Sequence, residues 1–94
     1  MPTAQMSFYD DPAEMRLEIL KHVPLGAPLA TAKSIMEANG FDCAIHQGEA
    51  KSPYLYCDQS RIWKEPVVRR WQVVVYYDES GVTDITVSTG LIGP

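Results

Sequence analysis

The side chains best suited to chemistry in this chain are two cysteines and two histidines. They are Cys43, Cys57, His22 and His46. Thiols and imidazoles act as nucleophiles, as acid–base groups and as metal ligands, and paired thiols form disulfides. The spacing of these four residues matches no zinc pattern and no nucleophile motif. We therefore expect no metal site, no cofactor and no catalytic site, and we predict that the protein is not an enzyme.

The cysteines lie in two short runs of alternating apolar residues. If these runs pair as a hairpin centred on Ala50, Ile45 faces Leu55 and Cys43 faces Cys57. Opposed residues of an antiparallel pair come within disulfide range. Reduced, buried thiols are the competing interpretation, because cysteine is a common core residue. A disulfide would favour a periplasmic or secreted protein and reduced thiols a cytoplasmic one, so the sequence leaves the localisation open.

The N-terminal half predicts two helices. Asp11, Pro12 and Glu14 form a typical helix start, with a capping carboxylate and a proline in the first turn. This helix is expected to run to about His22, with Glu18 on its solvent-facing side. A second amphipathic helix is expected over residues 28–39, ending at a glycine. Residues 1–9 precede both helices and are predicted to form a flexible arm.

From Phe41 onward the apolar period changes from 3.6 to 2, which is typical of strands. We predict strands over residues 41–46, 54–57, 67–77 and 82–89. Residues 58–66 are polar and are interpreted as a loop. The predicted fold is α+β, in the order ααββββ, with the two N-terminal helices packed on one face of a four-stranded antiparallel sheet. We expect residues 10–94 to form a single domain.

Alternation along the strands separates two faces of the predicted sheet. The apolar set is assigned to the core and comprises Trp71, Val73, Val75, Tyr77, Thr83, Ile85, Val87 and Thr89. The opposite face carries aromatic and basic residues, with Arg61, Trp63 and Lys64 in the adjoining loop. Tyrosine, tryptophan and arginine are enriched at binding hot spots, although exposed sheet faces also carry aromatics because these residues favour strands. The residues predicted to bind a partner are Tyr54, Tyr56, Trp63, Arg70 and Tyr76.

The segment from Leu25 to Leu29, followed by Ile35-Met36 and Asn39-Gly40-Phe41, resembles the signature of the SmpA/OmlA family. These are small bacterial lipoproteins of the outer-membrane assembly machinery. The same two helices and antiparallel sheet occur in the β-lactamase-inhibitor-protein fold, where a cysteine near the end of the second helix is bridged to a following strand. The resemblance implies this fold, a bridge between Cys43 and Cys57, and a role in protein binding within the envelope.

The bulk composition excludes several functions. The net charge is -4, which argues against general binding of nucleic acid or anionic membranes, and no apolar run is long enough to span a bilayer. We predict a non-catalytic protein-binding or structural module, from a bacterial envelope or secreted context, that presents the aromatic and basic sheet face. The alternative is a small-ligand-binding or enzyme-accessory domain with a pocket between helices and sheet. RNA binding by stacking ranks below both.

Overall fold

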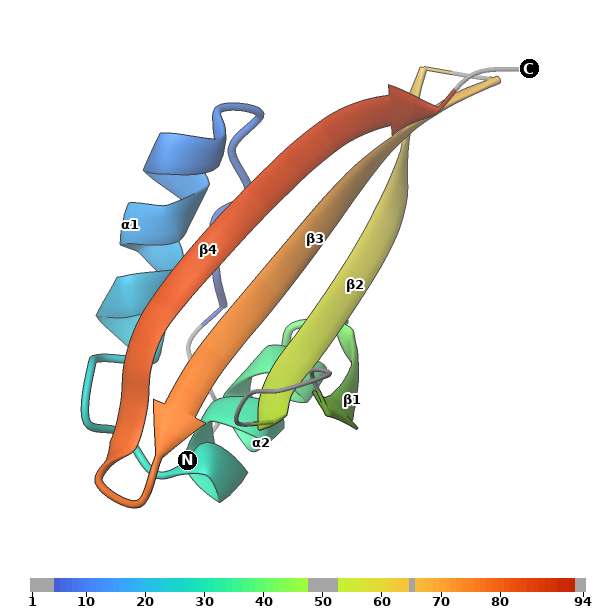
Figure 1. The fold of residues 1–94 in the computed structure, drawn as a ribbon. Helices are drawn as coiled ribbons and strands as arrows, with labels where there is room; N and C mark the ends of the chain where they lie inside the picture. Colours follow the sequence, from blue (N-terminus) through green and yellow to red (C-terminus); the bar gives the residue numbers. More distant parts are fainter. Residues whose placement is uncertain (1–4, 48–52, 65, 93–94) are drawn as a thin grey trace.

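The computed structural model describes residues 5–47, 53–64 and 66–92, and of residues 63 and 64 it describes the backbone alone. Two helices precede four strands, which form one antiparallel sheet in the order β1-β2-β3-β4 (Figure 1). The elements are α1 (Pro12–His22), α2 (Leu29–Ala38), β1 (Asp42–Gln47), β2 (Pro53–Lys64), β3 (Val67–Asp78) and β4 (Gly81–Ile92). This confirms the predicted α+β class and the order of its elements.

Local signals place the helices as expected. The Asp11 carboxylate accepts a hydrogen bond from Glu14 N–H at 3.3 Å and caps α1, with Pro12 in the first turn. The helix α2 ends at Ala38 with Asn39 as its C-cap, and Gly40 follows with a φ of 93°. A glycine adopts this left-handed conformation without a steric cost, so the chain turns here from helix into sheet.

The cysteine hairpin forms in the predicted register. Ile45 pairs with Leu55, and Cys43 pairs with Cys57. Their Cα atoms are 4.1 Å apart, a spacing close to that of a non-hydrogen-bonded antiparallel pair, and the two sulfurs form a disulfide. Of the alternatives that the sequence left open, the structure contains the disulfide.

The prediction of a loop over residues 58–66 is wrong for most of that segment. Strand β2 continues to Lys64, and it pairs with β3 as far as Val67, with an irregularity after Ile62. The polar composition of the segment suggested a loop because intrinsic strand propensity there is weak. A long, valine-rich β3 supplies the missing hydrogen-bonding partner, and such tertiary pairing overrides local propensity.

The core lies between the helices and the odd-numbered strand positions. Met15 and Ile19 of α1 and Met36 of α2 share one buried cluster with side chains of the sheet. The sheet residues in this cluster are Cys43, Leu55, Cys57, Trp71, Val73, Val75, Val82 and Ile85. Figure 1 shows α1 beside β4 and α2 near β1, while the end of β2, the start of β3 and the end of β4 extend away from both helices.

The assignment of Thr83 to the core is wrong. Thr83 is exposed, and Val82 is buried in its place, because a register shift at Tyr76 and Tyr77 inserts an extra residue into β4. The preceding Gly81 has a φ of 112°, and a Cβ there would lie 2.5 Å from Gly26 O. The loop between the helices therefore approaches β4 too closely for any other residue.

The N-terminal segment differs from the flexible arm expected over residues 1–9. Residues 1–4 lie outside the described part of the chain, but Met6 is buried in the core. The Phe8 ring stacks on Phe41 at 5.8 Å and meets Trp71 edge-on at 5.0 Å between ring centroids. Trp71 Nε1 also donates to Tyr9 O at 2.9 Å. The Phe8 ring, packed between Phe41 and Trp71, anchors the segment. The segment is too short for a hydrophobic period to reveal that role in the sequence.

Candidate partner-binding face of the sheet

Apart from Val82, which lies before the bulge in β4, the even-numbered strand positions form the face of the sheet that points away from the core, and we call this the open face. The register aligns it in rows across the strands. One row contains His46, Tyr54, Tyr76 and Asp84. The next contains Ala44, Tyr56, Val74 and Thr86. The third contains Asp42, Asp58, Gln72 and Ser88.

Four aromatic rings gather at one end of the open face. His46 stacks on Tyr54 with ring centroids 5.7 Å apart, and it meets Tyr56 edge-on at 5.6 Å. Tyr54 in turn lies 6.3 Å from Tyr76 on the neighbouring strand. These separations are typical of favourable aromatic pairs. Because the rings hold one another across three strands, they form a preorganised surface, and Tyr76 at its margin is 43% exposed.

A polar pair borders the aromatic rings. Arg70 donates two hydrogen bonds to the Asp58 carboxylate, at 2.8 and 3.0 Å, in a bidentate arrangement. These hydrogen bonds and the charge of Asp58 raise the pKa of Arg70 above its ordinary value. Next to this pair, Gln72 Nε2 donates to the Tyr56 hydroxyl at 2.7 Å. The open face is therefore less basic than the sequence suggested, since its arginine is neutralised by a neighbour.

The structure brings together most of the residues singled out in the sequence. Tyr54, Tyr56, Arg70 and Tyr76 all lie on the open face. The backbone of Trp63 belongs to β2, and its side chain lies outside the described part of the structure. Arg61 lies on the opposite face of β2, with its guanidinium 3.8 Å from the centroid of the Phe8 ring.

Sequence reasoning missed His46. It is absent from the residues predicted to bind a partner, although the predicted hairpin register already places it opposite Tyr54. Asp58 was missed for a different reason, because it fell in the predicted loop rather than on a strand. If β2 is assumed to pair with β3 over the full length of β3, Asp58 falls on a strand and on the open face.

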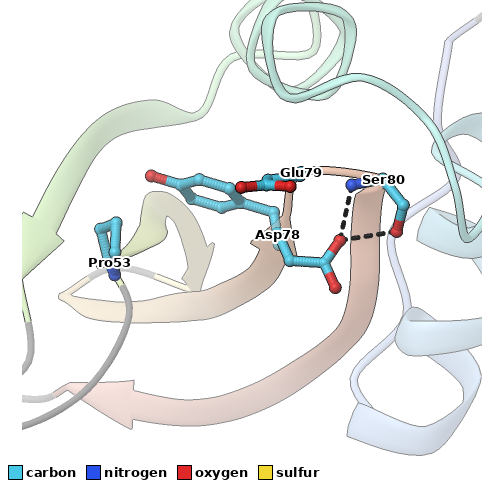
Figure 2. Close-up of a pocket in the computed structure, with 5 residues that line it drawn as sticks. Pro53, Asp78, Glu79 and Ser80 are labelled. Carbon is cyan, nitrogen blue, oxygen red and sulfur yellow. Dashed lines mark hydrogen bonds between the residues drawn. The ribbon is translucent and has the colours of Figure 1, made fainter.

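A recess lies away from the open face, at the turn between β3 and β4 (Figure 2). It has a volume of about 700 Å³, is open to solvent, and is lined by Pro53, Tyr77, Asp78, Glu79 and Ser80. The Asp78 carboxylate accepts hydrogen bonds from Ser80 N–H at 2.8 Å and Ser80 Oγ at 2.6 Å, which lower its pKa. The acid is thus occupied in stabilising its own turn.

Glu18 forms a third polar cluster, on α1. It was expected to face solvent, but it is buried, while Leu17 beside it is 60% exposed. Its carboxylate accepts from Ser7 N–H at 3.1 Å, and lies 3.1 Å from His22 Nε2 and 3.5 Å from Lys21 Nζ. The bond from Ser7, followed by the hydrogen bond and charges of His22 and Lys21, outweighs burial and lowers the pKa of Glu18.

This depressed pKa predicts a pH dependence of stability. The charged form of Glu18 is favoured by folding, so its contribution is present above its ordinary pKa of 4.5 and is lost as the pH falls through the lower folded value. Wild-type protein should therefore lose more stability than Glu18→Gln when urea melts at pH 6 and pH 3 are compared. The control Glu37→Gln, at an exposed helix position, should keep the wild-type response. An identical response of wild type and Glu18→Gln would contradict the assignment.

Fold and site together define a small α+β protein with a disulfide-bonded hairpin and an aromatic open face. Within the described residues, no group of three or more histidine, cysteine, aspartate or glutamate side chains is placed to hold a metal ion. None of the described helices is long and apolar enough to cross a membrane. Comparison with known proteins finds no matching family model, no matching curated protein and no matching solved structure.

Proposed function

We propose that this protein is a non-catalytic binding module that presents the open face to a protein partner. The observation that carries the proposal is the cluster of His46, Tyr54, Tyr56 and Tyr76, on the face opposite the helix-covered core. Rigid aromatic side chains contribute large contact areas with little loss of conformational entropy, and they are typical of interface anchors. The bidentate pair of Arg70 and Asp58 supplies a polar border.

We further propose an envelope or secreted location. The disulfide supports it, because such bonds persist mainly in oxidising compartments. An envelope role is also what the resemblance to the SmpA/OmlA family implies. The alternative, a small-ligand or enzyme-accessory domain, needs a pocket between helices and sheet. That space is occupied by the buried core residues, and the 700 Å³ recess lies elsewhere, so we favour protein binding.

The proposal predicts that binding depends on the open face. In affinity capture from periplasmic or secreted extract, the variant Tyr54→Ser/Tyr76→Ser should lose the captured partner, with affinity falling about thirtyfold for hot-spot residues. The single variant Trp63→Ala tests the remaining predicted residue. The matched control is Leu17→Ser/Leu25→Ser, because these two residues are exposed but lie outside the sheet. Equal capture by wild type and the tyrosine variant would exclude the open face as the interface.

A further inference from the structure

The outer edge of β4 has a capped part at its start. Gly26 N–H donates to Val82 O at 2.7 Å, and Val82 N–H donates to Ala27 O at 2.8 Å. Further along, Ile85 is capped on both of its backbone groups. Arg16 Nε donates to Ile85 O at 2.7 Å, and the carboxylate of the preceding aspartate accepts from Ile85 N–H at 2.8 Å. Groups of the chain itself therefore block the edge at Val82 and Ile85.

Beyond Ile85 the outward-facing backbone groups belong to Val87, Thr89 and Leu91. Residues of an antiparallel strand alternate between bonding one neighbour and facing the other side. The backbone N–H and C=O of Ile85 point to the outer edge, although its side chain is buried. Since β4 pairs with β3 without a register shift from Asp84 onward, the backbone groups of these three residues also point to the outer edge. Within the described part of the chain, no group is hydrogen-bonded to the backbone of these three residues on that side. The Thr89 hydroxyl does donate to Asp10 O, at 2.8 Å, but its own backbone groups stay available.

The uncapped stretch lacks the features that usually protect an edge strand. Residues 86–92 read TVSTGLI and contain no charged residue and no proline. Natural edge strands are commonly protected by such residues against pairing with another chain. Leu91 and Ile92 at its end are 49% and 48% exposed. The protein is acidic overall, but residues 86–92 carry no charge. The acid beside them is Asp10, whose backbone O accepts from Thr89 Oγ1 at 2.8 Å and whose carboxylate is paired with Arg69 at 2.9 Å.

We propose that this edge pairs with the same edge of a second copy of the chain, antiparallel and about a twofold axis at Thr89. Thr89 then faces its counterpart, and Val87 of each copy faces Leu91 of the other. In this register, the outward N–H and C=O of each of these three residues meet the outward C=O and N–H of the residue that faces it in the other copy. Ser88 faces Gly90 of the other copy, so only small side chains meet there and no like charges are opposed.

The cap on Ile85 favours a second copy over a foreign strand. A twofold pairing centred on Thr89 needs only residues 86–92 of each copy, and it stops short of Ile85. A longer foreign strand would run on to Ile85 and would have to displace Arg16, which also forms an ion pair with Asp84 at 2.9 Å. A homodimer contact of this kind is isologous, as most dimer interfaces are.

The pairing joins two four-stranded sheets into one and leaves both open faces uncovered. It is independent of the function proposed for that face. The contact involves one short strand from each copy, so its area falls below that of a standard stable interface. We therefore expect reversible, concentration-dependent association.

Sedimentation equilibrium tests the proposal over about 10 µM to about 1 mM, the range in which small interfaces associate. The wild-type mass should rise from 10.5 kDa towards twice that value. Leu91→Pro removes an outward N–H that β3 does not use, and it should weaken association by about tenfold or more. Leu91→Ala is the matched control, because it shortens the same exposed side chain and keeps the N–H. It should associate within about threefold of wild type, since no buried contact is lost.

Hydrogen exchange gives a second readout that needs no variant. The amides of Val87 and Leu91 should exchange more slowly as the wild-type concentration rises, while Ser88, already bonded to β3, should not change. Wild-type protein that stays monomeric up to about 1 mM would overturn the proposal and leave the edge to another kind of partner. Equal weakening by the proline and alanine variants would also overturn it, because a side-chain contact rather than strand pairing would then hold the dimer.

Discussion

Removing the disulfide in the double variant Cys43→Ala/Cys57→Ala should lower the free energy of unfolding by about 3 kcal/mol. The bridge closes a loop with a sequence separation of 14, and in the chain-entropy model a loop of about 15 residues contributes about that amount. A domain of this size has a total stability of only about 5–15 kcal/mol, so the loss is a large fraction of it. Urea denaturation of wild type and variant, both without reductant, measures the difference.

Reductant provides the control for this experiment. Wild-type protein treated with a phosphine reductant should show the same loss, whereas the double variant should not respond to reductant at all. A wild-type protein equally stable with and without reductant would contradict the expected role of the bridge. Alanine is used rather than serine because Cys57 is fully buried, and a serine hydroxyl there would add a desolvation cost.

The disulfide also connects stability to the proposed function. Strand β1 is short, and it pairs only with β2. It contributes His46, whose ring contacts both Tyr54 and Tyr56. The bridge ties β1 to β2 near the opposite end of that strand from His46. Loss of the bridge is therefore expected to loosen the aromatic end of the open face.

The cysteine hairpin was predictable because its two strands have a strict period of two. A single choice of turn centre then determined every pair, including Cys43 with Cys57. The end of β2 was not predictable in the same way. From Asp58 to Ser60 the residues are polar, so alternation gives no signal, and the strand exists because β3 lies beside it. Asp58, and with it the partner of Arg70, was lost for that reason.

Two other differences arise from backbone irregularity and from burial of polar groups. The bulge that buries Val82 in place of Thr83 lies where the loop at Gly26 and Ala27 hydrogen-bonds to Val82, a long-range contact without a local sequence pattern. Glu18 was assigned to solvent because it is charged. It is buried because Ser7, in a segment taken to be flexible, supplies a backbone N–H to its carboxylate. In both cases a contact between residues distant in sequence determines which side chain is buried.

The largest loss of stability is expected at Trp71. Its side chain is 4% exposed, it packs edge-on against Phe8, and its Nε1 donates to Tyr9 O at 2.9 Å. Trp71→Ala removes this core volume and should lower the free energy of unfolding by about 3–5 kcal/mol. Chemical denaturation followed by circular dichroism, which needs no tryptophan signal, measures the change.

Trp71→Phe separates packing from hydrogen bonding at the same position. It keeps an aromatic ring but removes the donor to Tyr9 O, and it should lose about 1–3 kcal/mol. If Trp71 anchors the N-terminal segment, amides such as those of Met6 and Ser7, which bond to Asn39 and Glu18, should also exchange faster in Trp71→Ala than in Trp71→Phe. Unchanged exchange in both variants would mean that the segment is held by Met6 and Glu18 without Trp71. The segment would then be anchored to the helices rather than to the sheet, and the core would have two separable halves.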